Sequence, residues 1–248
     1  PLPSLMDFSL VIGDTEYPAV RGDLMIPRSG LWTSDTLLGD TESPPAQGDV
    51  VTLRTYDRDR VGIVTDVGTE YGQIRLRIVG GKVDLSTVIE SRSYADYALS
   101  DIAADIVGDA GGLVDTLAGL EPTAPYWVRA RGTAASALRR VLGARATPAG
   151  GSDGVRLRLF AEDDGRLSTA IWSPTALTTP DAQNVASTYT TLAVWPQDRE
   201  AYIGPDLTTS IEPGNTIVIY DRQVAVVRAV YRFEPEDLRC QVWWEELG

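Results

Sequence analysis

The sequence contains no histidine, and this absence excludes more functions than any other feature of the composition. Without histidine there is no Ser-His-Asp or Cys-His nucleophile, no HExxH zinc site and no histidine acid or base. The single cysteine, Cys240, excludes an intrachain disulfide and any multi-cysteine metal cluster. Because Cys240 lies in the alternating apolar stretch 238–244, we expect it to be buried as a small hydrophobic residue.

Long apolar runs and positive charge are also scarce. No stretch approaches the roughly 18 consecutive apolar residues of a membrane helix, and the first residues predict no signal peptide. Lys and Arg number 22 against 35 Asp and Glu, which gives a net charge of −13. A surface of this sign repels nucleic-acid phosphate unless a local basic patch intervenes. The arginines between residues 54 and 77 alternate with aspartates, so we expect no specific binding of nucleic acid.

What the sequence does contain is alternation of apolar and polar residues near both ends, which predicts β-strands. The predicted strands span residues 8–12, 20–26, 49–56, 61–67 and 73–79, and then 190–195, 216–220, 223–233 and 238–244. The consecutive strands between residues 49 and 79 each have one apolar face. Such strands favour a small barrel or a strongly curled sheet.

The middle of the chain follows a different period. Apolar spacing predicts a helix from Ser100, as the N-cap, to the glycines after residue 110. A strand follows at 125–130, and then a second helix that Thr133 caps and Gly143 ends. The acidic turn at 162–165 predicts a hairpin between strands 155–160 and 167–172.

The predicted fold class is therefore α+β, mostly β, with two small antiparallel β-barrel-like domains that bracket an α/β insertion. Residues 1–97 are assigned to an N-terminal β-barrel-like domain and residues 98–185 to the helical and α/β insertion. Residues 186–248 are assigned to a C-terminal β domain that completes the second barrel.

Candidate catalytic and metal-binding motifs are weak. The pentapeptide 150–154 matches the G-x-S-x-G pattern around Ser152, but that mechanism needs a strand-to-helix turn and a histidine base. The paired carboxylates, such as Asp101 with Asp105 and Asp163 with Asp164, are expected on solvated turns and helix faces, where both ionise. We therefore predict no catalytic, cofactor-binding or metal-binding residue, and no enzyme activity.

The order of elements resembles a known family. A barrel hairpin at 61–81 is followed by a connector and by the helix Ser-Asp-Ile-Ala-Ala-Asp-Ile-Val, which ends in an Ala-Gly-Gly sequence. A strand at 126–130, a short helix, a hairpin with an Asp-Gly turn and paired closing strands after the Pro-Gly turn at 213–214 come next. This order is similar to hub proteins of tailed-phage baseplates and tail tips. The resemblance spans most of residues 48–244 and lies in architecture and spacing.

The resemblance implies a structural protein of the virion tail that is assembled in the host cytoplasm. It implies a homotrimer whose barrels, two per subunit, form a pseudo-hexameric ring between the tail tube and the tip. The implied partners are other copies, the tail tube or distal tail protein, the tip or spike and the tape measure. DNA would pass through the ring without specific binding, in line with an acidic chain.

Two alternatives from other classes stay open at this point. A carbohydrate- or receptor-binding β module of a phage tail should expose aromatic side chains on one sheet face. A carboxylate-dependent hydrolase should have one desolvated carboxyl across a cleft from a second.

One candidate interface follows from strand geometry. Arg75 and Arg77 share one face of the predicted strand, opposite the apolar residues at 74, 76 and 78. Because the apolar residues must face the barrel core, both arginines point outward. We predict that they meet carboxylates across a subunit interface. The candidate partners are Asp57 and Asp59, with Asp49 and Asp66.

Overall fold

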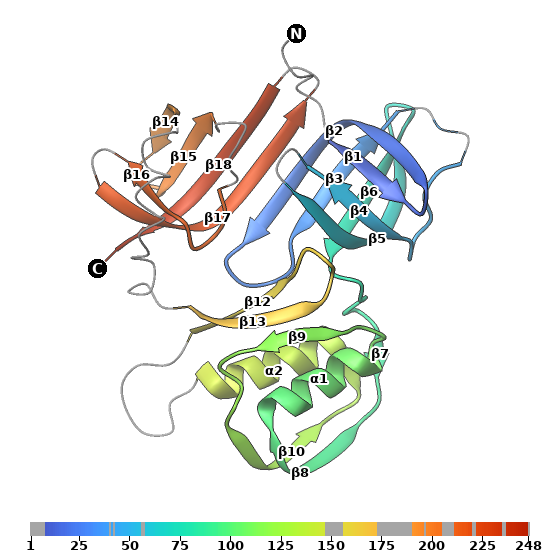
Figure 1. The fold of residues 1–248 in the computed structure, drawn as a ribbon, viewed down its shortest axis with the longest axis vertical. Coiled ribbons are helices and arrows are strands. Elements are labelled where there is room, and N and C mark those ends of the chain that lie inside the picture. The colour runs from blue at the N-terminus through green and yellow to red at the C-terminus, as the bar shows by residue number, and fades with distance from the viewer. Residues whose placement is uncertain are drawn as a thin grey trace. The chain divides into compact units, whose positions relative to one another are not determined.

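The computed structural model describes residues 8–39, 41, 43–55, 58–146, 156–172, 190–195, 197–204, 211–219, 222–234 and 237–247. The chain divides into two compact units, Pro1–Gly80 with Pro174–Gly248, and Gly81–Ser173 (Figure 1). We call the first the β unit and the second the insertion unit. The predicted mostly-β α+β fold, with a barrel and a small helical insertion, is confirmed.

The N-terminal part of the β unit is a closed antiparallel barrel. Its strands are β1 (Ser9–Ile12), β2 (Thr15–Pro27), β3 (Thr33–Leu38), β4 (Val50–Arg54), β5 (Asp59–Glu70) and β6 (Gln73–Gly80). They pair in the order β1-β4-β5-β6-β3-β2, and β2 returns to β1. Alternation along the strands turns leucines such as Leu10, Leu24, Leu53 and Leu76 into the barrel, where each is at most 1% exposed.

An indole ring lies against two glycines of the barrel wall. Gly62 on β5 and Gly80 on β6 are cross-strand partners, and the Gly80 N–H donates to the Trp32 carbonyl at 2.8 Å. A Cβ atom at either glycine would lie within 2.8 Å of the Trp32 ring. The buried indole therefore requires both positions to lack a side chain.

Replacing Gly80 by alanine is expected to lower the free energy of unfolding by about 2 kcal/mol, because the new Cβ would lie 2.4 Å from Trp32 Nε1. Chemical denaturation followed by tryptophan fluorescence measures this change. Gly68→Ala is the matched control, because its Cβ would meet only the Arg75 side chain at 3.9 Å. Equal stability of the two variants would contradict the packing of Trp32 on Gly80.

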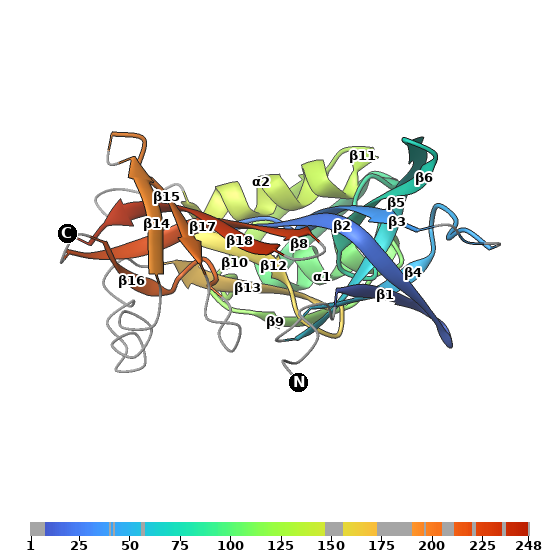
Figure 2. The same ribbon diagram turned by 90° about the horizontal axis from the view of Figure 1, so that it is seen from above.

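The C-terminal strands continue the sheet of the barrel beyond β2. These strands are β14 (Thr190–Trp195), β15 (Glu200–Gly204), β16 (Thr216–Ile219), β17 (Arg222–Glu234) and β18 (Asp237–Glu246). One edge of β17 pairs with both β16 and β2, and β18, β15 and β14 follow on its other edge (Figures 1 and 2). Phe233 of β17 stacks on Phe8 with ring centroids 4.1 Å apart. Among the described residues no pairing joins β14 to β16, so closure of a second barrel stays a prediction.

Cys240 lies in the middle of β18 and is buried, as the alternation around it predicts. Burial raises the pKa of its thiol to about 12. The thiol is therefore protonated and unreactive at neutral pH, as expected for a packing residue.

The insertion unit packs two helices against short sheets. Its elements are β7 (Val88–Ile89), β8 (Arg92–Ala98), α1 (Leu99–Asp109), β9 (Val114–Leu117), β10 (Thr123–Arg129), β11 (Gly132–Thr133), α2 (Ala134–Ala146), β12 (Arg156–Ala161) and β13 (Leu167–Trp172). The pairs β8–β10 and β7–β11 form two-stranded sheets, and β12, β13 and β9 form a third sheet. The predicted hairpin is the pair β12–β13. No helix within the described ranges is long and apolar enough to cross a membrane.

Two of the predicted helix boundaries, the start of α1 and the end of α2, differ from those in the structure. Ser100 is not the N-cap of α1; Ala98 holds that position without a side-chain cap, because the Leu99 and Ser100 N–H groups donate to carbonyls of residues 122 and 120. Thr133 does cap α2, through the Ser136 N–H. Gly143 does not end α2, which continues to residue 146, because a single glycine costs a helix only about 1 kcal/mol.

The division of the chain at residues 97/98 and 185/186 stays a prediction. Residues 81–97 form part of the compact insertion unit, because β7 pairs with β11 and β8 pairs with β10. The second predicted boundary lies outside the described residues.

A buried arginine holds the insertion unit together. Arg129 on β10 is 3% exposed, forms ion pairs with Asp105 and Asp109 of α1, and donates from Nε to the Glu90 carbonyl at 3.0 Å. The Tyr94 hydroxyl donates to Asp105 at 2.5 Å. Asp105 is therefore a structural carboxylate inside a hydrogen-bond network, and not the solvated surface residue that the sequence predicts.

The stability of this network should depend on pH through Tyr94. Burial, reinforced by the hydrogen bond to Asp105, raises the pKa of Tyr94 from 10.0 to about 12. Its contribution is therefore complete below pH 10 and is lost as the pH rises toward 12, because the unfolded chain ionises first. In thermal melts between pH 9 and 12, the melting temperature of wild type relative to Tyr94→Phe should fall. A constant difference would contradict the raised pKa.

Candidate assembly interface

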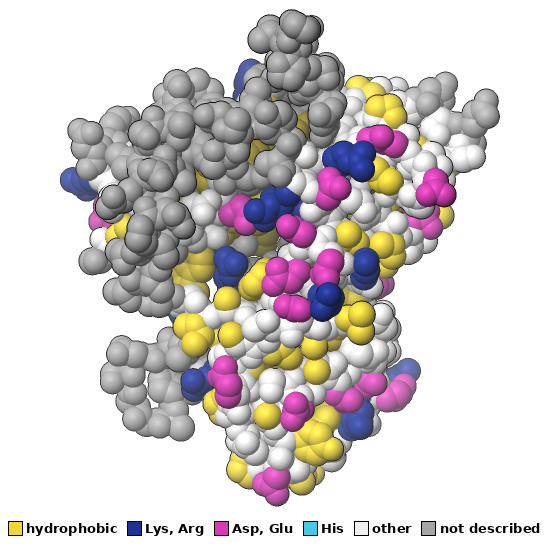
Figure 3. Space-filling model, viewed as in Figure 1, with side chains coloured by type: hydrophobic (Ala, Val, Ile, Leu, Met, Phe, Trp, Pro, Cys, Tyr) yellow, Lys and Arg dark blue, Asp and Glu magenta, His cyan; other side chains and the backbone are white. Residues whose placement is uncertain are grey.

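A row of charged side chains crosses the outer face of the continuous sheet in the β unit. Direct cross-strand partners share a face, so the register lines up one residue from each of six adjacent strands. In the order β18, β17, β2, β3, β6 and β5, these residues are Arg239, Arg232, Asp23, Asp35, Arg77 and Asp66. We call them the charged row. Figure 3 shows acidic and basic side chains interspersed over the barrel strands.

A row of mainly apolar residues lies next to the charged row on the same face. It is displaced by two residues along most strands, so the side chains point to the same side. From β17 to β4 its members are Val230, Met25, Thr33, Val79, Ile63 and Val50. Val50 is 46% exposed and the others are partly exposed. An apolar stripe bordered by charge is typical of a protein–protein interface.

The predicted residues lie partly on this face. Arg75 and Arg77 point outward, opposite Leu76 and Ile78, which are fully buried. Arg75 Nη2 lies 3.3 Å from Asp66 Oδ2 of the same chain, and both side chains are about half exposed. Arg77 is exposed, with Asp35 and Asp66 as its cross-strand partners.

Two of the other predicted partners, Asp59 and Asp49, contact other residues of the same chain. Asp59 lies at the start of β5, where Arg54 Nε approaches its carboxylate at 3.5 Å. Asp49 instead accepts a hydrogen bond from the Ala46 N–H at 2.8 Å. Asp57 lies outside the described residues.

Asp23 is the least solvated carboxylate of the charged row. Arg232 Nε lies 3.6 Å from Asp23 Oδ1, and this oxygen is buried without a hydrogen-bond partner among the described residues. Desolvation raises the pKa of Asp23, while Arg232 and Arg21 oppose the increase. Its cross-strand partner on β3 is Asp35, so two carboxylates lie side by side. A further cation beside Asp23 would stabilise the ionised form of its carboxyl group.

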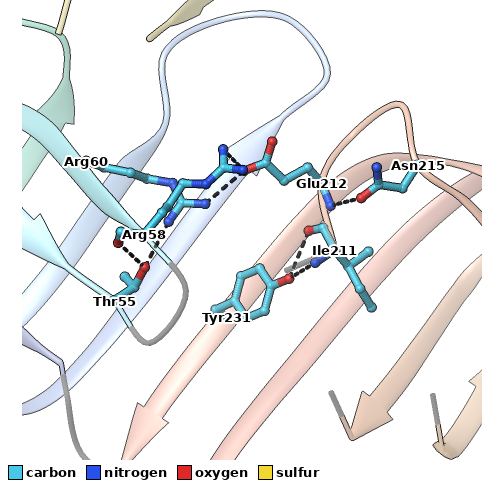
Figure 4. Close-up of polar contacts among 7 residues, drawn as sticks. All are labelled: Thr55, Arg58, Arg60, Ile211, Glu212, Asn215 and Tyr231. Atoms are coloured by element: carbon cyan, nitrogen blue, oxygen red, sulfur yellow. Dashed lines mark hydrogen bonds and ion pairs between the residues drawn. The ribbon is translucent and has the colours of Figure 1, made fainter. Parts of the chain in front are cut away.

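A second cluster ties the barrel to the segment before β16 (Figure 4). Glu212 Oε1 accepts hydrogen bonds from Arg58 Nη1 at 2.9 Å and from Arg60 Nη2 at 2.8 Å. The Arg60 side chain is only 5% exposed and also donates to Thr55 Oγ1 at 3.0 Å. The Glu212 N–H is fixed by Asn215 Oδ1 at 2.6 Å. A nearly buried guanidinium therefore holds the two halves of the β unit together.

Sequence reasoning missed Asp23, Asp35, Arg232 and Glu212. The row depends on β3, which the sequence did not predict, and on the pairing of β2 with β17, which joins distant segments. The only local signal is alternation, which places Asp23 between the inward residues Gly22 and Leu24.

The catalytic motifs gain no support from the structure. Ser152 lies outside the described residues, and Asp164 binds Arg166 at the hairpin turn. Among the described residues, no group of three histidine, cysteine or acidic side chains could hold a metal ion.

Comparisons with known proteins relate this fold to tail proteins. No family model matches the sequence, and no curated protein matches it. A 43 kDa tail protein of prophage MuSo2 from Shewanella oneidensis matches in structure with a TM-score of 0.70 and 11% identity, over 96% of this chain and 97% of that one. A tail protein from Neisseria meningitidis MC58 matches with a TM-score of 0.65 and 11% identity, over 97% and 96%.

A third structure comes from a secretion system. The E. coli c3393 protein, a component of the type VI secretion system with structural similarity to T4 bacteriophage tail proteins gp27 and gp5, matches with a TM-score of 0.64 and 10% identity. The match covers 96% of this chain and 77% of that one. The chain therefore has the fold of phage tail proteins along almost its whole length.

Proposed function

We propose that this chain is a structural, non-enzymatic subunit of a phage tail tip or baseplate. Copies of it would form a homotrimeric ring, the hub, that joins the tail tube to the tip and conducts DNA. The observation that carries this proposal is the fold shared with tail proteins over 96–97% of both chains. The outer face with its apolar and charged rows supplies a surface suited to contact between copies.

Charge supports the passage of DNA through such a ring. The β unit contains 12 basic and 23 acidic residues, a net charge of −11, whereas the insertion unit contains 10 and 12, a net charge of −2. A ring built from β units would therefore repel phosphate at short range and would not retain DNA.

The alternative of a carbohydrate- or receptor-binding module has less support. The exposed aromatic residues among those described are Tyr71, on the turn after β5, and Tyr97 and Tyr126, on β8 and β10. Tyr97 pairs with Ala124 and Tyr126 pairs with Ala95, so the two tyrosines are diagonal neighbours on the small β8–β10 sheet. The large sheet of the β unit has only Tyr71 as an exposed aromatic residue among those described, so it offers no row of aromatics on which a sugar could stack.

The proposal is tested by mass photometry and negative-stain imaging of the purified full chain. We expect a species of three copies that appears as rings, with a population that rises with protein concentration. A chain that stays monomeric at all concentrations would overturn the ring. Binding of glycans by that monomer would favour the alternative.

A further inference from the structure

The insertion unit contains a basic segment inside an acidic protein. Residues 129–158 include seven arginines and one acidic residue, Asp153. The helix α2 contributes Arg139 and Arg140, both exposed, and neither forms an ion pair with any residue in the described ranges. Two adjacent cations that form no ion pair within the described part of the chain are unusual in a protein with a net charge of −13.

Arg140, which Arg139 precedes on the same helix, borders a hollow between the end of β10 and the first turns of α2. Its lining includes Trp127, Val128, Arg131, Thr133, Ser136 and Arg140. We call it the α2 groove. Arg131 is 70% exposed, and its ion pair with the exposed Glu90 at 3.2 Å contributes little, because both groups are solvated.

Any attraction of the α2 groove for an acidic group comes from its arginine side chains and not from the N-terminus of α2. The Ala134 N–H donates to the Thr87 carbonyl at 3.0 Å, and the Ala135 N–H donates to the Leu85 carbonyl at 2.9 Å. The next N–H, of Ser136, is capped by Thr133. The first donors of α2 are therefore already bound, which leaves the guanidinium groups as the cationic element.

Apolar side chains continue from the groove along β10. Val128 is 51% exposed and Tyr126 is 68% exposed. Their cross-strand partners on β8 are Ser93 and Ala95, so both lie on one face of this two-stranded sheet. Exposed apolar residues beside Arg140 and the weakly paired Arg131 suit a polypeptide partner better than nucleic acid, which needs continuous positive charge.

We propose that the α2 groove binds an acidic surface of the β unit of a second copy of this chain. The chain itself supplies the complementary charge, since the β unit has a net charge of −11. A head-to-tail contact of this kind uses one groove and one acidic surface per copy and closes into a ring. The inference rests on the proposed ring and names a second contact within it.

The double charge reversal Arg139→Glu/Arg140→Glu tests the contact. We expect the dissociation constant of the assembly, measured by mass photometry, to rise at least about tenfold through like-charge repulsion. The control Lys82→Glu/Arg156→Glu makes the same change in net charge at exposed positions outside the groove. It should change the dissociation constant by no more than about twofold.

Photo-crosslinking identifies the partner. Ser136, exposed on α2, is replaced by p-benzoylphenylalanine, and ¹⁵N-labelled chains are mixed with unlabelled chains before irradiation. We expect crosslinks between labelled and unlabelled chains that join residue 136 to acidic segments within 1–80 or 174–248. Crosslinks found only within single chains would overturn the proposal.

Two further outcomes separate this inference from the ring itself. If wild type assembles and Arg139→Glu/Arg140→Glu assembles equally well, only the groove contact is wrong. If wild type never assembles, both are wrong. Loss of duplex DNA binding in the double variant with unchanged assembly would identify nucleic acid as the occupant and overturn the contact.

Discussion

Replacing Glu212 by alanine should lower the free energy of unfolding by about 3 kcal/mol. The substitution removes the carboxylate that accepts hydrogen bonds from Arg58 and from the Arg60 guanidinium, and the Arg60 side chain is only 5% exposed. Thr55 Oγ1, which also accepts a hydrogen bond from Arg60, is neutral and cannot replace the negative charge of Glu212. Urea denaturation followed by tryptophan fluorescence measures the loss.

A solvated ion pair of the same chemical type is the control. Glu246 lies 3.6 Å from Arg222, and the two side chains are 65% and 75% exposed. Glu246→Ala should therefore change the free energy of unfolding by less than about 0.5 kcal/mol. Equal effects of the two substitutions would mean that Glu212 does not compensate a buried charge.

The strands that the sequence predicts are those rich in apolar residues, either alternating or in short runs. β6 alternates almost without interruption, whereas β17 contains runs of valine and other apolar residues; the predicted bounds of both lie within a few residues of the observed ones. β3 was missed because its inward positions include Ser34 and Thr36. Both are buried, and their hydroxyls lie 2.9 Å apart and bond to each other. Such a pair replaces apolar packing with a local hydrogen bond and removes the signal on which prediction depends.

The partners of the predicted interface residues depend on register. The pairing of β5 with β6 shifts between Val64 and Asp66, so that Asp66, and not Thr65, lies opposite Arg77. A bulge of this kind exchanges the neighbours of every later residue. The direction of Arg75 and Arg77 followed from alternation alone, whereas the identity of their neighbours required the register.

Long-range contacts could not be predicted from the sequence, for a different reason. Arg60 and Glu212 are 152 residues apart, and nothing in either local segment indicates the other. Both segments look like charged turns. Their association follows from the pairing of β2 with β17, which brings the two halves of the β unit together.

Reversing the charge of the predicted arginines, Arg75→Glu/Arg77→Glu, should prevent assembly while the chain still folds. Arg75 is 43% exposed and its pair with Asp66 is solvated, so the free energy of unfolding should fall by only about 1 kcal/mol. Facing a neighbouring copy, the two glutamates would join Asp35 and Asp66 in an acidic patch. Like charges at an interface cost several kcal/mol, which corresponds to a dissociation constant raised roughly a hundredfold.

Mass photometry measures the assembly and thermal melting measures the fold of the same preparation. Lys82→Glu/Arg222→Glu is the control, because it changes the net charge equally at exposed positions outside the charged row. The control should assemble as wild type does, since distant surface charges are screened at physiological salt. If Arg75→Glu/Arg77→Glu also assembled normally, the outer face of β6 would be free surface, and contact between copies would have to use another face of the β unit.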